Sequence, residues 1–234
     1  PYTTLFRSTH MARLLGGFPG GEAISGLIRL LMDPAKSVRL EAVKSLGRLK
    51  ALAAVPQLCT ALRDVDLKVH TAAIEALVTI GDPSAVGHLV DVLKDESEYA
   101  RRGAVEVLNE VVTVDAIKDL VQALRDEDWW VRVRAADALG TLGGPKVVEA
   151  VIGLMRDPDE FIRRYAVEIL NTIPDERAVE PLLEALRDHD WWVRERSIDA
   201  LGRIRDPRAV EPLLALLRQE PQAAPHCVRA LREI

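Results

Sequence analysis

Aromatic side chains are the residues of this 234-residue chain whose spacing most suggests a chemical role. Beyond residue 20 all of them fall in a short set of positions: Tyr99, Trp129, Trp130, Phe161, Tyr165, Trp191 and Trp192. Four of these recur at intervals of 31 residues, namely Tyr99, Trp130, Phe161 and Trp192. Arg134 and Arg196 follow two of the tryptophans by four residues, which allows cation–π stacking on a helix, and Tyr165 takes the same position after Phe161. Because aromatic and arginine side chains are enriched at binding hot spots, the pattern predicts a binding surface.

A purely structural interpretation stays open for part of this set. Trp129 and Trp191 could pack over a turn, and duplication could have copied a tryptophan pair without selection for binding. For the column of Tyr99, Trp130, Phe161 and Trp192, large rings at solvent-facing positions have no role in folding.

The polar residues indicate structure rather than catalysis. An aspartate column (33, 64, 95, 126, 157 and 188) and an arginine column (39, 101, 132, 163 and 194) recur along the chain. A catalytic pair is needed once, whereas a ladder that ties each turn to the next repeat is needed everywhere. Cys59 and Cys227 occupy positions filled elsewhere by apolar or small residues, so we expect both to be buried.

No catalytic residue, metal site or cofactor is predicted. The chain contains no phosphate-binding glycine loop, dinucleotide fingerprint, nucleophile elbow or CxxC pair. The formal net charge of −5 does not indicate the basic face that a nucleic-acid-binding protein needs. No apolar run is long enough for a membrane span. Two distant cysteines do not indicate a disulfide framework, so a reducing, cytoplasmic compartment is expected.

A 31-residue repeat must position these side chains. Residues 175–205 serve as the template, and each repeat carries two helical patterns. In the second one, Val193, Ser197, Ala200, Leu201 and Ile204 form one apolar stripe. Positions 192, 196, 199 and 203 lie on the opposite stripe. Asp128 and Asp190 are suited to cap the second helices of their repeats.

Seven repeats fit the chain. They span residues 20–50, 51–81, 82–112, 113–143, 144–174, 175–205 and 206–234, and together form a single predicted array. Residues 11–19 match the tail of a second helix and are interpreted as the remnant of a truncated repeat. Residues 1–10 are interpreted as a non-native or disordered leader. Neither end has a polar capping unit, so the chain is expected to be a fragment or to meet a partner, with self-association through the uncapped ends as one outcome.

The repeat resembles the HEAT-like repeats of the phycobilin-lyase type, a family that includes designed binding scaffolds. Its signature, D-x-R-A-V-E-P-L-L-x-A-L-R-D-x-D-x-x-V-R-x-x-A-x-x-A-L-G, is clearest at residues 175–202. The resemblance implies an all-α fold, a right-handed α-solenoid or HEAT-like superhelix of about seven two-helix repeats. It also implies that the stripe of residues 192 and 196 lines the concave surface. HEAT-like iron hydroxylases carry repeated His-Glu pairs, whereas no histidine here is followed by glutamate.

The favoured function is a non-catalytic protein- or peptide-binding scaffold that uses the concave aromatic and arginine residues. One alternative is a subunit of a bilin lyase or isomerase, which the resemblance implies. Another is a HEAT-like DNA glycosylase, which handles damaged bases with concave Trp, Arg and Asp residues. A loosely similar set here is Trp130, Arg134 and Asp137. The acidic balance of charge counts against the glycosylase, and a protein or peptide partner is predicted rather than a nucleic acid or a membrane.

Overall fold

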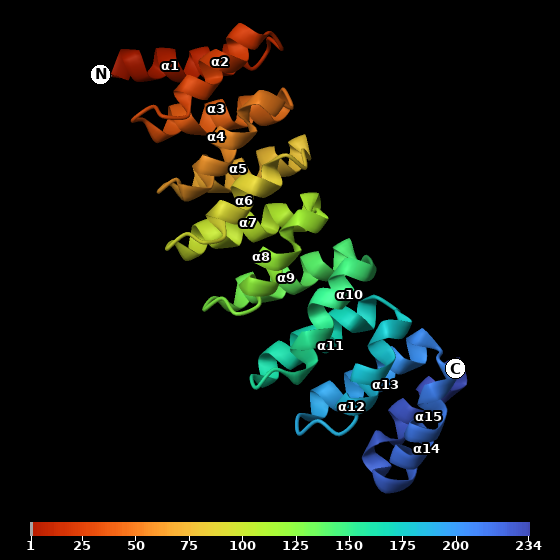
Figure 1. Ribbon diagram of the computed structural model, residues 1–234. Helices are drawn as coiled ribbons and strands as arrows, with labels where there is room; N and C mark the ends of the chain where they lie inside the picture. Colours follow the sequence, from red (N-terminus) through yellow and green to blue (C-terminus); the bar gives the residue numbers. More distant parts are fainter. Residues whose placement is uncertain (1) are drawn as a thin grey trace. The chain divides into compact units, whose positions relative to one another are not determined.

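In a computed structural model that describes residues 2–234, every regular element within that range is a helix. The elements follow one another as stacked helix pairs, so the fold is an α-solenoid (Figure 1). The chain divides into two compact units. Unit 1 ends at Ala116 and unit 2 spans Ile117–Ile234.

Unit 1 holds the first three helix pairs and the start of a fourth. Its elements are α1 (Tyr2–Leu15), α2 (Gly21–Leu30), α3 (Lys36–Arg48), α4 (Val55–Thr60), α5 (Leu67–Ile80), α6 (Ala85–Val92) and α7 (Glu98–Val111). Short 3₁₀ turns flank the first helices: η1 (Leu52–Ala54), η2 (Ala61–Arg63) and η3 (Val114–Ala116).

Unit 2 holds the remaining pairs. Its helices are α8 (Ile117–Ala123), α9 (Trp129–Leu142), α10 (Gly144–Ile152), α11 (Glu160–Thr172), α12 (Val179–Ala185), α13 (Trp191–Ile204), α14 (Val210–Gln219) and α15 (Ala224–Glu233). Its 3₁₀ turns are η4 (Gly153–Arg156), η5 (Glu176–Ala178), η6 (Pro207–Ala209) and η7 (Pro221–Ala223).

Helix α1 continues across residue 10, where the sequence suggested a boundary between a leader and a repeat remnant. It packs on α3, and the Ser45 hydroxyl donates a hydrogen bond of 3.1 Å to the Ala12 carbonyl. Residues 2–10 are therefore helical, whereas residue 1 lies outside the described residues. That residues 1–10 are foreign to the natural protein stays a prediction.

The second helix of each pair packs against the second helix of the next pair within each unit. Helices α3, α5 and α7 form such a row in unit 1, and α9, α11, α13 and α15 form one in unit 2 (Figure 1). Small side chains make this approach possible. A Cβ at Gly47 would lie 2.9 Å from the Ala76 Cβ, and one at Gly202 would lie 2.9 Å from the Ala230 Cα. Small side chains also recur at 31-residue steps on these helices and are fully buried there: Ala42, Ala73, Ala104, Ala135, Ala166 and Ser197.

Aspartate side chains start four of the second helices, and in α11 the Asp159 carboxylate accepts a hydrogen bond from the Phe161 N–H. Asp66 accepts a hydrogen bond from the Lys68 N–H, Asp128 from Trp130 and Val131, and Asp190 from Trp192 and Val193. These contacts satisfy backbone donors that have no partner within the first helical turn. The predicted capping roles of Asp128 and Asp190 are confirmed.

The first helices bury one face, which α12 illustrates. Helix α12 ends at Ala185, which is buried together with Leu182 and Leu186, whereas Leu183 is half-buried. The reason is the helical period: positions 182, 185 and 186 share one face, and position 183 is rotated by about 100° from 182.

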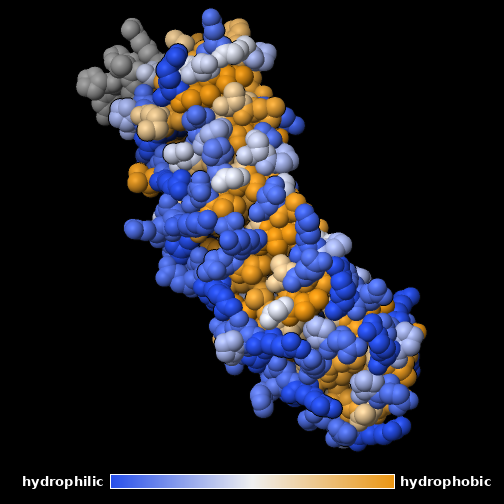
Figure 2. Space-filling view, viewed as in Figure 1, coloured by the Kyte–Doolittle hydropathy of each residue, from blue (hydrophilic) through white to orange (hydrophobic). Residues whose placement is uncertain are grey.

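Hydrophilic residues dominate the surface in the view of Figure 2, but hydrophobic residues also reach the surface in each unit. Met32 and Val65 are the most exposed large hydrophobic residues, with 82% and 95% of their surface accessible. Among residues 2–234, none of the helices combines the length and the apolar composition needed to cross a membrane.

Candidate aromatic binding surface

Three rings of the predicted column lie at one equivalent place in unit 2. Trp130, Phe161 and Trp192 are the second residues of α9, α11 and α13, and these three helices pack side by side in that order. We call the set formed by these rings and by Arg134, Arg164 and Arg196 the aromatic face. Its position follows from the caps, because each helix begins one residue before the ring.

Solvent reaches most of the rings. Trp130 is 38% exposed and Phe161 52%, while Trp192 is half-buried. Val131, Ile162 and Val193, the next residues along each helix, are at most 2% exposed. The core and the rings therefore occupy different sides of the same helical turn.

Each ring of the aromatic face has an arginine guanidinium over its face. The Cζ-to-centroid distance is 6.0 Å for Arg134 and Trp130, and 5.3 Å for Arg164 and Phe161. It is shortest, 4.5 Å, for Arg196 and Trp192. Cation–π stacking fixes both partners of each pair and leaves the remainder of the ring open to a ligand.

Trp192 is held more firmly than its exposed neighbours. Its indole Nε1 donates a hydrogen bond of 2.9 Å to Glu168 Oε1 on α11. Arg196 Nε lies 3.0 Å from the same carboxylate oxygen, and Arg196 Nη1 lies 3.3 Å from Asp199. Trp192 thus links two consecutive second helices and has a structural contact as well as an accessible ring.

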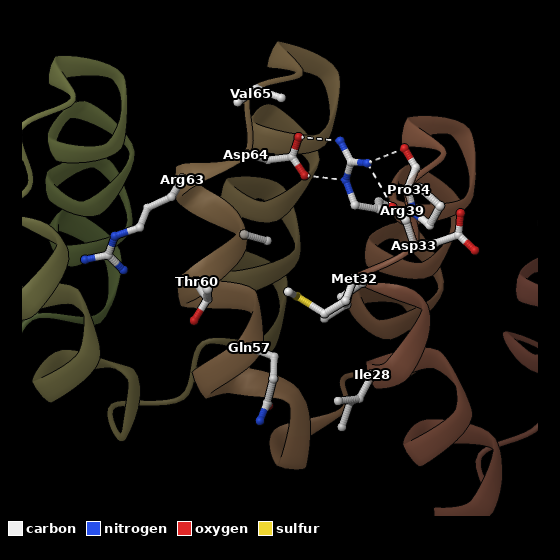
Figure 3. Close-up of a pocket in the computed structure, with 12 residues that line it drawn as sticks. Ile28, Met32, Asp33, Pro34, Arg39, Gln57, Thr60, Arg63, Asp64 and Val65 are labelled. Atoms are coloured by element: carbon white, nitrogen blue, oxygen red, sulfur yellow. Dashed lines mark hydrogen bonds and ion pairs between the residues drawn. The ribbon is translucent and has the colours of Figure 1, made fainter.

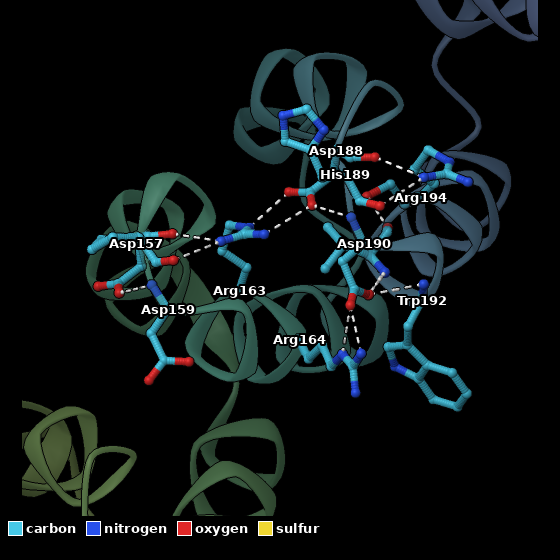
Figure 4. A network of polar contacts seen from close by, with 12 residues as sticks. Asp157, Asp159, Arg163, Arg164, Asp188, His189, Asp190, Trp192 and Arg194 are labelled. Carbon is cyan, nitrogen blue, oxygen red and sulfur yellow. Dashed lines mark hydrogen bonds and ion pairs between the residues drawn. The ribbon is translucent and has the colours of Figure 1, made fainter.

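Arg164 connects the aromatic face to the start of α13 (Figure 4). Its Nε donates to Asp190 Oδ2 at 3.1 Å, while the other carboxylate oxygen of Asp190 caps α13 through the Trp192 N–H at 2.9 Å. The hydrogen bonds from Arg164 lower the pKa of Asp190, and the capping N–H groups lower it further. The cap therefore stays charged and the ring of Trp192 is held in place.

Trp129 and Trp191 precede the face residues on α9 and α13. Trp129 is 58% exposed and Trp191 54%. Each stands edge-on to its neighbour, with centroids 5.5 Å apart for Trp129 and Trp130 and 5.4 Å apart for Trp191 and Trp192. The two pairs form similar right-angled aromatic corners, with interplanar angles of 89° and 85°.

The other two predicted residues are placed differently. Tyr165 is half-buried on α11, and none of the described side chains stacks on its ring. Tyr99 is the second residue of α7 in unit 1, is 51% exposed and has the Arg102 guanidinium 5.8 Å from its ring centroid. It repeats the local geometry of the aromatic face on the other unit.

Two arginines of the column, Arg39 and Arg163, form rungs of the predicted ladder, whereas Arg132 and Arg194 donate to carbonyl groups of their own turns. Arg39 donates from Nε and Nη2 to both carboxylate oxygens of Asp64 and from Nη1 to the Asp33 carbonyl (Figure 3). Arg163 does the same with Asp188 and the Asp157 carbonyl (Figure 4). Arg39 and Arg163 therefore each tie their own turn to the turn of the next repeat.

Between the Arg39 rung and the first helices of unit 1 lies a pocket of about 500 Å³. It is lined mainly by Ile28, Leu31, Met32, Gln57, Thr60 and Val65, with the Arg39–Asp64 pair at one end (Figure 3). Ile28, Leu31, Met32 and Val65 suit contact with an apolar group, and Gln57 and Thr60 add hydrogen-bonding groups beside them.

One histidine and both cysteines are buried and serve packing. His70 stands in the arginine column, is 7% exposed and places Nδ1 2.9 Å from the Leu62 carbonyl oxygen. Burial raises the pKa of the Cys59 thiol to about 12, and burial also raises that of Cys227. Within residues 2–234, no group of three His, Cys, Asp or Glu side chains is arranged to hold a metal ion.

Two residues of the surface were missed by the sequence interpretation. Arg164 follows Phe161 by three residues rather than four, so the search at a spacing of four overlooked it. Glu168 binds Trp192 from the preceding repeat, 24 residues earlier. The signal for Glu168 was its place one repeat before Asp199, on the stripe opposite the core.

Comparisons with known proteins bear on the whole chain. A family model described as HEAT repeats matches residues 10–77, 24–109, 86–171 and 150–232, which together span nearly all of it. A comparison with curated proteins finds no match.

Solved structures share the fold at low sequence identity. Importin beta matches with a TM-score of 0.62 and 19% identity over 91% of this chain and 35% of its own. Kap95p, from a structure with RanGDP, matches with a TM-score of 0.61 and 17% identity over 95% of this chain and 37% of its own. A designed armadillo repeat protein in complex with the peptide (KR)4 matches with a TM-score of 0.50 and 18% identity over 76% of this chain and 98% of its own.

Proposed function

This chain belongs to the HEAT-repeat family, and we propose that it is a non-catalytic scaffold that binds a protein or peptide through the aromatic face of unit 2. The observation that carries the proposal is the row of Trp130, Phe161 and Trp192, in which every ring is stacked by an arginine and open to solvent on part of its surface.

Folding alone does not account for this row. The core of the second helices is complete without it, because Val131, Ala135 and Leu139 of α9 are fully buried while Trp130 is 38% exposed. Clustered exposed rings are typical of interaction sites, and tryptophan, tyrosine and arginine dominate binding hot spots. Stacked arginines also order the rings before binding, which lowers the entropy lost on association.

The partner class follows from charge and from the solenoid neighbours. The designed armadillo protein carries a basic (KR)4 peptide. The rings here are instead flanked by guanidinium groups, which favour acidic or neutral partner segments. The formal net charge of −5 does not favour the many phosphate contacts that a nucleic acid or an anionic membrane offers, so we propose a protein or peptide partner. The two buried free thiols suit a reducing compartment, and the cytoplasm is the proposed location.

The test is selection of peptides from a random 12-residue library on the full chain, followed by affinity measurements with variants. The double change Trp130→Ala and Phe161→Ala should weaken binding of the selected peptides by about 2 kcal/mol or more. Its melting temperature should stay close to that of the parent, since surface changes usually alter stability by less than about 1 kcal/mol.

A matched control removes an exposed hydrophobic side chain elsewhere. Leu52 in η1 of unit 1 is 61% exposed, so Leu52→Ala should leave affinity unchanged. The proposal is wrong if the double variant binds the selected peptides as tightly as the parent. The bilin-binding alternative would instead show a shift in the absorbance of an added bilin, lost in the same double variant.

A further inference from the structure

A polar pocket adjoins the aromatic face at its Trp192 end. It has a volume of about 310 Å³, lies between α13 and α15, and is lined by Arg196, Asp199, Arg203, Arg229, Ala230 and Glu233. The close approach of Gly202 and Ala230 brings the two helices together there. Arg196 belongs to both sites, because its guanidinium also lies 4.5 Å from the centroid of the Trp192 ring.

The acceptors of Asp199 in this pocket are already used. Asp199 Oδ1 accepts from Arg229 Nη2 at 2.6 Å and lies 3.4 Å from His226 Nδ1, and Oδ2 accepts from Arg196 at 3.3 Å. Its side chain is only 11% exposed. Asp199 therefore holds two arginines at the pocket and offers little to a ligand.

Arg203, in contrast, has donors to spare. Its Nη1 donates a hydrogen bond of 3.0 Å to the Asn171 carbonyl, and no carboxylate among the described residues forms an ion pair with it. A guanidinium group has five N–H donors, so most of those of Arg203 are open to solvent. Glu233, the remaining charged residue of the lining, is exposed and likewise forms no ion pair with a described residue.

We propose that this pocket binds the carboxylate of an acidic side chain in the partner, with Arg203 as the main donor and Arg196 and Arg229 beside it. The inference rests on the proposed function, since the partner segment would run from the pocket across Trp192 toward Phe161. A planar guanidinium binds a carboxylate through two parallel hydrogen bonds, which gives the partner a direction along the face.

Glu233 provides a test in which a substitution should strengthen binding rather than weaken it. Its carboxylate is close enough to Arg229 to raise the pKa of that guanidinium, so it competes with an incoming carboxylate for the arginines of the pocket. Removing that charge should strengthen binding, whereas removal of a structural side chain would not.

The experiment titrates the full chain with N-acetylated hexaglutamate and, as a neutral control, with hexaglutamine. The side-chain Nε–Hε resonance of Arg203 should shift saturably with hexaglutamate alone. Affinity should fall about tenfold in Arg203→Gln. It should rise about threefold in Glu233→Gln. The matched control Arg218→Gln, which changes an exposed arginine of α14 outside the pocket, should leave affinity unchanged.

Equal resonance shifts with hexaglutamine, or equal losses of affinity in the Arg203 and Arg218 variants, would show that the pocket is not a carboxylate site. Inorganic phosphate that binds more tightly than hexaglutamate would overturn the assignment to an acidic peptide. The two proposals fail separately. If selected peptides depend on Trp130 and Phe161 but not on Arg203, the pocket is wrong and the aromatic face stands. If hexaglutamate binds Arg203 while no selected peptide needs the rings, the aromatic face is wrong.

Discussion

The ladder rungs of unit 1 and unit 2 are nearly identical in geometry. In unit 1, Arg39 Nε lies 2.7 Å from Asp64 Oδ2 and Nη2 lies 2.9 Å from Oδ1; in unit 2, the distances from Arg163 to Asp188 are 2.7 and 3.0 Å. Side-chain exposure is 14% for each arginine and 10% for each aspartate. A feature that recurs so closely in both units belongs to the repeat itself.

The second residue of the second helices shows the opposite behaviour. Unit 1 places Ser37 and Lys68 there before Tyr99, whereas unit 2 places Trp130, Phe161 and Trp192 there before Pro225 of α15. Four positions further on, unit 1 has Glu41 and Ala72, and unit 2 has Arg134 and Arg196 with Tyr165 between them. The repeat folds with either set, so the rings and arginines are additions to a structure that does not require them.

The capping aspartates have the same structural role in both units but different partners. Asp66 in unit 1 pairs with Lys36 Nζ at 2.9 Å, and Asp190 in unit 2 pairs with Arg164. Both aspartates start a second helix and both are neutralised from the preceding repeat. In unit 2 the neutralising side chain also stacks on Phe161, so the cap and the aromatic face share one arginine.

The largest expected effect concerns the core, where the two units should behave alike. Leu77 in unit 1 and Leu201 in unit 2 are equivalent and at most 2% exposed. Leu77→Ala and Leu201→Ala should each cost roughly 2–5 kcal/mol, because each leaves a cavity between packed helices. Chemical denaturation of the two variants measures this, and a small loss in either would show that its unit lacks the packing described.

The ladder comes next. Arg39→Ala and Arg163→Ala should each destabilise by about 1–3 kcal/mol, between the values for exposed and buried ion pairs. Burial raises the pKa of Asp64, but hydrogen bonds from Arg39 and the Asp66 N–H outweigh it, and the net pKa is lowered. A lowered pKa stabilises the fold above the unfolded aspartate value of about 3.9, and this contribution disappears as pH falls through the folded value.

The loss caused by Arg39→Ala should therefore shrink when unfolding is measured at progressively lower pH below about 4. Arg39→Gln keeps a hydrogen-bond donor but loses the charge, so its stability should lie between that of the parent and that of Arg39→Ala. A loss that is independent of pH would show that the rung acts by packing alone.

Within the aromatic corners, substitution of Trp192 should cost more stability than substitution of Trp191. Trp192→Ala removes the hydrogen bond to Glu168 and the contact with Arg196, at a cost of about 1–2 kcal/mol. Trp191→Ala removes an exposed ring and should cost less than about 0.5 kcal/mol. Thermal melts decide this, and equal losses would mean that Trp191 also packs structurally over the turn.

The last comparison concerns the ends of the second helices. Gly81 in unit 1 and Arg205 in unit 2 are equivalent and both adopt left-handed backbone angles, with φ of 63° and 62°. Arg205→Gly should stabilise by about 1 kcal/mol, because only glycine adopts this conformation without strain. Gly81→Ala should destabilise by a similar amount, and melts that move both variants in the same direction would contradict the argument.

The repeat and its core could be predicted because they depend on period. Val193, Ser197, Ala200 and Leu201 recur at helical spacing and are all buried, and the ladder recurs with them. The left-handed Arg205 could not be predicted, since local preference favours glycine there and tertiary packing overrides it.

The binding residues were only partly predictable for the same reason. Trp130 and Arg134 are four residues apart on one helix, so their contact follows from local geometry. The contact of Glu168 with Trp192, and the pocket of Arg203 between α13 and α15, depend on how one helix meets the next. The pattern within one helix does not predict which side chains of the next helix it will contact.

Tryptophan fluorescence tests the central claim most directly, because all four tryptophans of the chain lie at positions 129, 130, 191 and 192. The signal therefore reports on the aromatic face and its two corners without contribution from the core. In the free protein, emission should be at long wavelength and strongly quenched by acrylamide. A selected peptide should shift it to shorter wavelength and protect it from quenching. Short-wavelength, quencher-resistant emission in the free protein would contradict the account, as would peptide binding that leaves the emission unchanged.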